Sequence, residues 1–266
     1  MAHAARRRSR RSQRRIPAGL MPRRRRLPIT TVVFDLDDTL YDCYRQRVLV
    51  AHRYASKKML AAGLRRSTGR RLTIESVFRL RLRLFRKERN LDTLDRRLCA
   101  RLGLQGKLAE RLARVGYKAY FTCPVGRLRL FPDSLPTLRR LHRCGGRLFI
   151  LTAGDLSVQR TKVRKLGLDR LSCVQQVFYT GLRMGRGKIQ RLRQVLRYEP
   201  NPKKVLVVGD RPDSEIRAAR ELGMRAVRRL GGEFARTRPR HRLERPDFTI
   251  RRLSQLFSLG FRFGYK

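Results

Sequence analysis

Acidic residues are concentrated in two short stretches of an otherwise strongly basic chain. Of the 20 Asp and Glu residues, seven lie within positions 35–42 and 210–215, although the 266 residues carry a formal net charge of +47. Carboxylates this close repel one another and destabilise a fold unless a positive charge lies among them. A hard divalent cation binds oxygen ligands and removes that repulsion. The clustering therefore predicts a Mg²⁺ site that includes Asp35, Asp37 and Asp210.

Asp35 and Asp37 lie two residues apart at the end of an apolar run. Because side chains alternate along a strand, both carboxylates should point to the same side. One can act as a nucleophile while the other transfers protons, and a carboxylate that attacks phosphorus forms an aspartyl-phosphate. Asp38 and Asp42 fit turn or capping positions as well as they fit a metal site.

The acids follow segments that are typical of buried parallel strands. Three apolar runs, each ending in polar residues, alternate with stretches of helical spacing. The strand segments are 29–37, 146–155 and 203–215, and the helical ones are 134–146, 157–168 and 214–224. This alternation predicts a doubly wound parallel α/β sheet, in which ligands bind at the carboxyl ends of the strands.

Residues 42–124 lack this alternation and read as amphipathic helices, so we expect a helical cap inserted into a core formed by 28–41 and 125–266. The stretch 78–85 is ambiguous, because its strict alternation fits a strand; its neighbours favour a helix. Residues 123–133 carry Pro and Gly and would form the return hinge.

Residues 1–27 contain a cluster of Arg and no acidic residue, which predicts a disordered, self-repelling tail. It could be an arm that contacts nucleic acid or another polyanion, an organelle transit peptide, or an extension without function. The positive charge of the whole chain either attracts polyanions or reflects a compositional drift towards Arg.

The five Cys residues are scattered and form no CxxC pair, which favours a reducing compartment and no structural metal. No apolar run reaches 18 residues, and the N-terminus lacks the apolar stretch of a secretory signal. We expect a cytoplasmic protein without a membrane span, with an organelle as the alternative.

Four motifs together resemble those of the haloacid dehalogenase superfamily. They are "DLDDTL", "LFILTAG", the lysine of "GRGKIQRLRQVL", and "VLVVGDRPDSEIRAARELGMRAV", and they occur in the order of that family. The resemblance covers about residues 29–40 and 125–230 and implies a Rossmann-like core. Dehalogenases of the superfamily lack a second Asp at the place of Asp37, so the chain resembles the phosphatase branch. The insertion is similar to a helical C1 cap, which implies a small phosphorylated substrate.

The resemblance also implies roles for the residues of the first motif. Asp35 would be the nucleophile and a Mg²⁺ ligand. Asp37 would be the general acid and base, with its backbone carbonyl on the metal, and Thr39 would help to order the loop.

The later motifs imply the remaining roles. Thr152 and the backbone amides of Ala153 and Gly154 would hold phosphate oxygens, Lys188 would neutralise charge between the phosphate and Asp35, and Asp210 would complete the metal site. A nucleophile, a metal, a cation and neutral donors are what phosphoryl transfer requires.

The fourth motif departs from the family pattern. Many relatives have an Asp five residues after the first Asp of this motif, whereas this chain has Glu215, and Asp213 is close enough to substitute for it. Asp213 or Ser214 can instead cap the following helix. Lys188 lacks the Pro that often follows it and could be a plain surface lysine, although Lys162 lies out of register to replace it.

The sequence thus predicts a Mg²⁺-dependent phosphomonoester hydrolase acting on a small phosphorylated metabolite. A phosphotransferase or phosphomutase would use the same nucleophile. The alternative of another class is a nucleic-acid-associated protein that uses the fold as a scaffold, which the basic composition favours.

Overall fold

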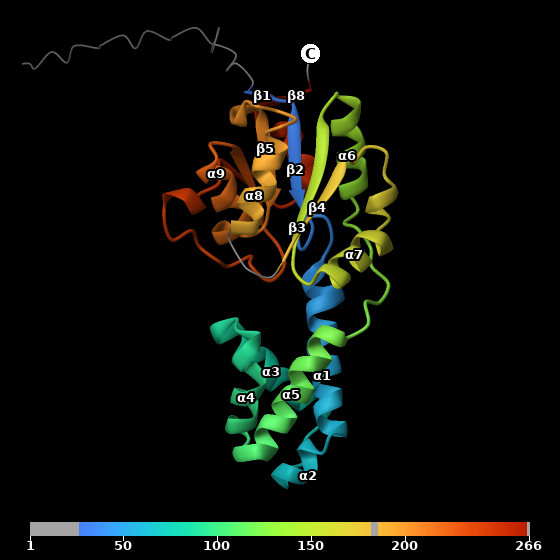
Figure 1. Ribbon diagram of the computed structural model, residues 1–266, viewed down its shortest axis with the longest axis vertical. Helices are drawn as coiled ribbons and strands as arrows, with labels where there is room; N and C mark the ends of the chain where they lie inside the picture. Colours follow the sequence, from blue (N-terminus) through green and yellow to red (C-terminus); the bar gives the residue numbers. More distant parts are fainter. Residues whose placement is uncertain (1–26, 182–185, 265–266) are drawn as a thin grey trace, which may run out of the picture.

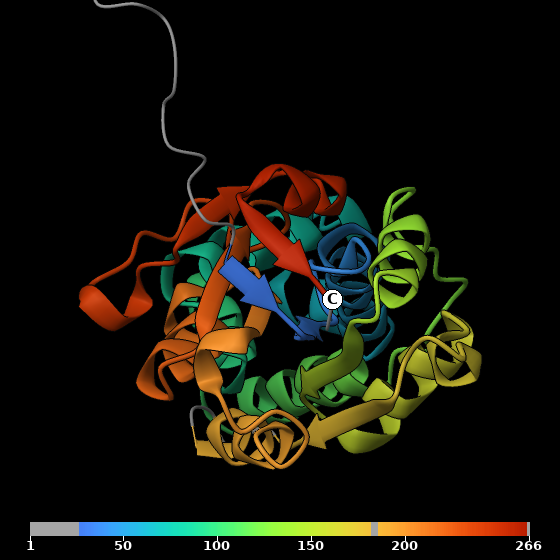
Figure 2. The same ribbon diagram turned by 90° about the horizontal axis from the view of Figure 1, so that it is seen from above.

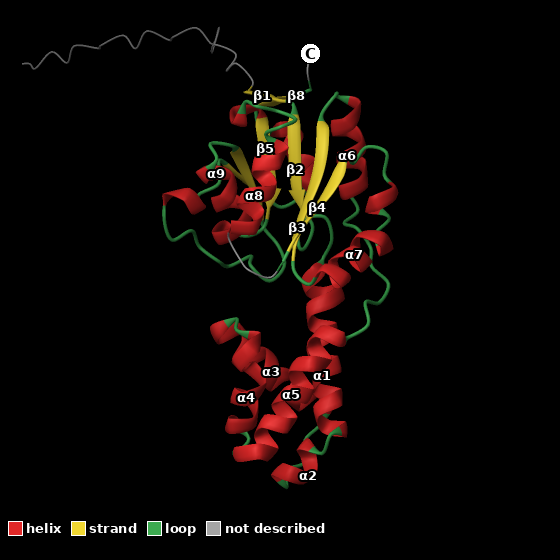
Figure 3. Ribbon diagram, viewed as in Figure 1, coloured by secondary structure: helices red, strands yellow, loops and turns green. Residues whose placement is uncertain are grey.

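The computed structural model describes residues 27–181 and 186–264, which form a layered α/β core and a bundle of helices beyond one end of its sheet (Figures 1 and 3). The predicted basic tail lies outside the described residues, except that Leu27 begins a strand. Within the described residues, no helix combines the length and the apolar character that crossing a membrane requires.

The central sheet confirms the predicted doubly wound parallel fold. Its strand order is β4-β3-β2-β5-β6-β7, every neighbouring pair is parallel, and β1 pairs with β8 in a separate small sheet. The strands are β1 (Leu27–Ile29), β2 (Thr31–Asp35), β3 (Arg147–Ala153), β4 (Gln176–Thr180), β5 (Val205–Gly209), β6 (Arg225–Arg229), β7 (Phe248–Ile250) and β8 (Phe261–Phe263). The chain runs from β2 outward through β3 to β4 and then crosses to β5 on the other side of β2, so the topological switch point lies beside β2.

Helices cover both faces of this sheet because the strands are apolar on both faces. Val32 and Phe34 of β2 pack with α6 (Ser134–Arg143) and α7 (Leu156–Lys165), whereas Val33 packs with α8 (Arg186–Val195) and α9 (Arg217–Glu221). The view from above shows α6 and α8 on opposite faces (Figure 2). Period-2 alternation in a fully buried strand thus supplies two cores.

The bundle forms from the segment between β2 and α6. It consists of a π-helical turn, Tyr44–Val48, followed by α1 (Leu49–Ala61), α2 (Leu64–Thr68), α3 (Ile74–Glu88), α4 (Leu91–Arg101) and α5 (Gly106–Thr122). These elements lie within the range predicted for the inserted cap. The boundaries of the cap and its C1 class stay predictions.

The ambiguous stretch 78–85 lies within α3, as predicted from its neighbours. Its misleading alternation arises because Arg81 lies on the buried face of the helix. The Arg81 guanidinium donates to Asp95 at 2.7 and 2.6 Å, and its third nitrogen lies 2.6 Å from Nδ1 of the buried His52. A buried cation with a paired carboxylate replaces the apolar residue that a helical pattern would lead one to expect.

Candidate active site

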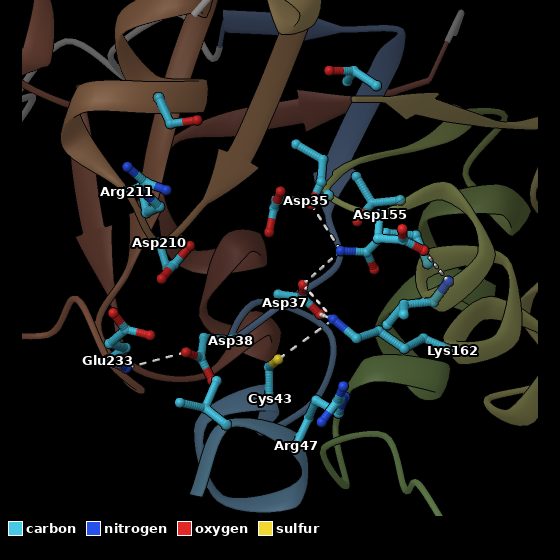
Figure 4. A pocket seen from close by; sticks show the side chains of 18 of the residues that line it. Asp35, Asp37, Asp38, Cys43, Arg47, Asp155, Lys162, Asp210, Arg211 and Glu233 are labelled. Carbon is cyan, nitrogen blue, oxygen red and sulfur yellow. Dashed lines mark hydrogen bonds and ion pairs between the residues drawn. The ribbon is translucent and has the colours of Figure 1, made fainter. Parts of the chain in front are cut away.

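The carboxyl ends of β2, β3 and β5 face the helical bundle, and a cavity of about 260 Å³ lies there (Figure 4). The cavity is lined by most of the predicted site residues, namely Asp35, Asp37, Thr152, Ala153, Gly154, Lys188 and Asp210. Of the others, Glu215 lies behind the lining, Thr39 is buried, and Asp213 is exposed at the surface.

Asp35 ends β2 and faces Lys188, from the first turn of α8. Lys188 Nζ donates to Asp35 Oδ1 at 2.7 Å and to Glu215 Oε2 at 2.6 Å, and all three residues are buried. Burial raises the pKa of Asp35 to about 7 against the opposing attraction of Lys188. Lys188 is therefore no plain surface lysine; it is the cation that balances the strand-end acids.

Asp35, Asp210 and Glu215 form a compact acidic cluster. One oxygen of each lies within 4.8 Å of the others. Burial, together with Glu215 and Asp35, raises the pKa of Asp210 well above its usual value. Lys188 alone does not balance three carboxylates, and the donor set is all oxygen, so the residues fit a hard divalent cation such as Mg²⁺.

The helix after β5 carries Glu215 into this cluster. Gly209 permits the approach, because a Cβ on residue 209 would lie 2.0 Å from Glu215 Cγ. Glu215 Oε1 accepts from the Arg211 amide at 2.6 Å. Burial acts to raise the pKa of Glu215, but Lys188 and this hydrogen bond outweigh it and hold the pKa at about 2. Glu215 is therefore an ionised oxygen donor.

Asp213 points away from the cluster and pairs with Arg211 at 3.0 Å. The prediction that Asp213 or Ser214 caps the following helix is wrong. The helical segment begins with a π-helical turn at Pro212, so both residues lie inside it, and the preceding residue, Arg211, makes no side-chain cap. Pro212 suits the first helical position, because its missing amide hydrogen would have no partner there and its ring fixes φ near the helical value.

Asp37 has a separate set of partners, two of them on α7. Its carboxylate accepts from Lys162 Nζ at 2.8 and 3.0 Å, from Gln159 Nε2 at 3.1 Å and from Tyr41 Oη at 2.8 Å. Burial opposes ionisation, but Lys162 leads the interactions that outweigh it, so the pKa of Asp37 is lowered. The structure thus presents Asp37 as a carboxylate.

Sequence reasoning missed Gln159 and Lys162. They lie three residues apart on α7, so they share a helix face, and α7 begins directly after the loop that ends β3. Asp155 starts this helix by accepting from the Val158 amide at 3.0 Å. The sequence signal that could have found them is their spacing of three residues in the helix that directly follows the motif at the end of β3.

The end of β3 supplies neutral donors. Thr152 is buried at the strand end, and Gly154 has φ of 149°, a backbone conformation that favours glycine. Gln159 Nε2 also donates to the Ala153 carbonyl at 2.7 Å and so fixes this loop. The Thr39 hydroxyl is buried and has no hydrogen-bond partner among the described residues, so no contact supports its predicted ordering role.

Asp38 is a structural residue of the first loop. It has φ of 55°, and its carboxylate accepts from the amides of Tyr44 and Glu233 at 2.9 and 3.1 Å. Arg229 of β6 donates to the Asp38 carbonyl at 2.8 Å. These bonds explain the acid without a metal, which was one of its two expected readings.

Together these groups form two adjacent units. Asp35 lies with Lys188 beside a cluster of oxygen ligands that fits a cation, and Asp37 lies with Lys162 on the other side. Such an arrangement can supply the nucleophile, the charge stabilisation and the proton transfer that phosphoryl transfer needs.

Comparison with known proteins agrees with this chemistry. Residues 29–223 match the model of the haloacid dehalogenase-like hydrolases. A curated glyceraldehyde 3-phosphate phosphatase from Methanopyrus kandleri is 30% identical over 87% of this chain and 97% of its own length. The phosphatase of the same name from Methanocaldococcus jannaschii is 28% identical over 87% and 96%. A solved haloacid dehalogenase-like hydrolase from Streptococcus pneumoniae shares the fold, with a TM-score of 0.56 at 18% identity over 86% of this chain and 97% of that one.

Proposed function

Because the chain belongs to the haloacid dehalogenase-like hydrolase family, we propose that it is a Mg²⁺-dependent phosphomonoester hydrolase that acts through an aspartyl-phosphate on Asp35. The family match and the curated relatives confirm the predicted superfamily and its phosphatase branch. The observation that carries the mechanism is the buried Asp35 carboxylate, held 2.7 Å from Lys188 beside the acidic cluster.

We assign the first half-reaction to Asp35. Its carboxylate oxygen attacks phosphorus, a new P–O bond forms, and the bond from phosphorus to the ester oxygen breaks. The leaving oxygen takes a proton from Asp37. Lys188 offsets the negative charge that gathers between the phosphate and Asp35, and the Thr152 hydroxyl with the amides of Ala153 and Gly154 binds the phosphate oxygens.

In the second half-reaction, water attacks the phosphorus of the aspartyl-phosphate. Asp37 takes a proton from this water, inorganic phosphate leaves and Asp35 is restored. The Lys162 ammonium keeps Asp37 ionised in the structure, which supports its role as the base of this step. The two steps require Asp37 to alternate between its protonated and ionised forms.

Asp35, Asp210 and Glu215 would hold the Mg²⁺, joined by the backbone carbonyl of Asp37 as the family resemblance implies. Bound there, the ion would supply positive charge to the phosphate oxygens and orient them towards Asp35. Of the two expected candidates for the third acid, geometry favours Glu215, because Asp213 lies at the surface with Arg211.

The substrate we propose is a small phosphorylated metabolite of about the size of glyceraldehyde 3-phosphate, which the names of the relatives give as their substrate. A cavity of about 260 Å³ enclosed by the helical bundle suits such a molecule better than a macromolecule. The nucleic-acid role rests on the basic composition and on the Arg-rich tail, which lies outside the described residues, and it gains no support from the comparisons. The cytoplasmic location stays a prediction, and a phosphotransferase or phosphomutase stays the alternative that uses the same nucleophile.

The test is release of inorganic phosphate from a panel of phosphomonoesters of three or four carbons, with Mg²⁺ and with EDTA. We expect metal-dependent release by the wild type and a loss of at least about 10³-fold in kcat for Asp35→Asn, because no other described carboxylate occupies the place of the nucleophile. Retention of the wild-type melting temperature by the variant would control for folding. Unchanged turnover in folded Asp35→Asn would overturn the assignment.

A further inference from the structure

Arg47 carries a buried positive charge that no acidic residue balances. Its exposed fraction is 6%, yet it forms no ion pair with a carboxylate among the described residues. Nη2 donates to the Tyr120 carbonyl at 3.3 Å, while Nε and Nη1 have no nitrogen or oxygen partner among the described residues. Burial raises the pKa of the neighbouring Cys123 thiol against the opposing charge and hydrogen bond of Arg47, so the thiol stays neutral and supplies no counter-charge. A buried, unpaired guanidinium destabilises a fold unless something else compensates it.

Arg47 lines the same cavity as Asp35 and Asp210 but at the other end. Arg47 belongs to the π-helical turn that joins the core to the bundle, and Figure 4 shows it on the side of Cys43 and Lys162. Lys162 is already paired with Asp37 at 2.8 Å. The bundle end of the cavity therefore has an excess of one positive charge.

The cavity lining combines polar and apolar side chains. Figure 4 shows the paired Asp37 and Lys162 between Asp35 and Arg47. Leu91, Tyr120, Phe121 and Val158 add apolar surface to the lining, against which a short carbon chain can pack. A ligand that spans the cavity would carry its phosphate at Asp35 and Lys188 and place its other end at Arg47.

We propose that Arg47 binds a carboxylate at the far end of the phosphorylated substrate, so that the protein prefers phosphorylated carboxylic acids of about three carbons; this inference rests on the proposed function. One carboxylate neutralises the single unpaired cation, whereas a second, doubly charged phosphate would leave negative charge in a buried site. The glyceraldehyde 3-phosphate in the names of the relatives has no carboxylate, so this preference would distinguish the chain from them.

The test compares kcat/KM for three-carbon substrates that differ in the group at the far end. They are 3-phosphoglycerate with a carboxylate, glycerol 3-phosphate with a neutral hydroxymethyl group, and 1,3-propanediol bisphosphate with a second phosphate. We expect the wild type to favour 3-phosphoglycerate over the other two. Arg47→Met, which keeps the length of the side chain, should lower kcat/KM for 3-phosphoglycerate by about 10- to 100-fold, the effect of one charge-assisted hydrogen bond. The change for glycerol 3-phosphate should stay within about threefold.

Two further variants separate recognition from folding. Arg47→Lys should keep part of the preference that Arg47→Met loses, because lysine has the positive charge but lacks the paired, planar donors with which a guanidinium binds a carboxylate. Arg45→Gln is the matched control, since Arg45 lies two residues away with its side chain 81% exposed. The melting temperature of Arg47→Met should equal or exceed that of the wild type, because the substitution removes an unpaired buried charge; a purely structural arginine would lower it.

The outcomes discriminate between the two proposals. Hydrolysis of glycerol 3-phosphate at least as fast as 3-phosphoglycerate, or an equal loss on both substrates in Arg47→Met, would overturn the role of Arg47 and leave the phosphatase standing. A preference for the bisphosphate would overturn the carboxylate assignment. Absence of Mg²⁺-dependent hydrolysis of every substrate, including p-nitrophenyl phosphate, would overturn the proposed function and this inference together.

Discussion

At the residue scale, the two acids that compete for one role differ sharply in their surroundings. Glu215 is buried beside Lys188, whereas the Asp213 side chain is 45% exposed. We expect Glu215→Gln to raise the Mg²⁺ concentration for half-maximal activity by about 10- to 100-fold, because it weakens a charged oxygen donor at the metal site. Asp213→Asn is the matched control and should change this concentration by less than about twofold. A Mg²⁺ titration of phosphate release measures both.

The opposite pattern, with Asp213→Asn impaired and Glu215→Gln unaffected, would move the third metal ligand to the surface residue and contradict the cluster. A Mg²⁺ dependence equal to that of the wild type in both variants would mean that neither acid belongs to the metal site.

Residues at strand ends were predictable from the sequence, whereas their partners from other elements were not. Asp35 and Asp210 follow apolar runs that can only be buried strands, and parallel strands bring their carboxyl ends to one edge. Lys162 and Arg47 reach the same cavity from a helix and a π-helical turn, and their directions depend on how these pack against the sheet. Gly209 leaves room for Glu215 at the strand end, since a Cβ on residue 209 would lie 2.0 Å from Glu215 Cγ, and no spacing in the sequence encodes this close approach.

At the element scale, the helical bundle contains a buried histidine whose protonation opposes folding. His52 of α1 lies against the Arg81 guanidinium, and burial, followed by the charge of Arg81, lowers the pKa of His52 to about 2. An unfolded histidine has a pKa near 6.5, so below about pH 6.5 this histidine binds a proton in the unfolded chain but stays neutral in the folded chain. Stability from this group is complete above about pH 6.5 and is lost as the pH falls.

We therefore expect the free energy of unfolding of the wild type to fall by about 1 kcal/mol more than that of His52→Gln between pH 7 and pH 5.5, because glutamine takes no proton. Urea denaturation followed by circular dichroism at the two pH values measures this difference. His142→Gln, at an exposed position, is the control and should keep the wild-type pH dependence. A parallel fall in the wild type and His52→Gln would mean that His52 is not held neutral.

Elements with strong local signals were predictable, and those made by distant pairing were not. The strands β2, β3 and β5 are continuous apolar runs, a pattern that is typical of strands buried on both faces, so they could be recognised from the sequence. The small sheet of β1 and β8 joins Leu27 to Phe261, and a three-residue strand gives no periodicity. The π-helical start of the segment after β5 was also missed, because the capping pattern placed the helix N-terminus too late.

At the scale of the whole molecule, the bundle touches the core on the far side of the cavity from its covalent connections. Arg89 ends α3 with φ of 52°, and its guanidinium donates to the Glu233 carbonyl at 3.1 Å and to the Thr237 hydroxyl at 3.3 Å. The same group lies 4.6 Å from the centre of the Phe234 ring, whose residue lines the cavity. The Arg89 side chain thus connects the bundle to the loop after β6, and we expect this contact to favour the arrangement in which the bundle covers the cavity.

We expect Arg89→Ala to raise KM for the best substrate by about 3- to 10-fold, since it removes two exposed hydrogen bonds and a cation–π contact that together stabilise closure. The radius of gyration measured by small-angle X-ray scattering should increase, because the bundle then moves away from the core more often. Arg83→Ala, an exposed substitution on the same helix, controls for the loss of one positive charge and should change neither quantity. An unchanged KM and an unchanged radius of gyration in Arg89→Ala would show that the position of the bundle depends only on the two segments that connect it to the core. A rise in both would identify Arg89 as the contact that couples the bundle to the cavity it covers.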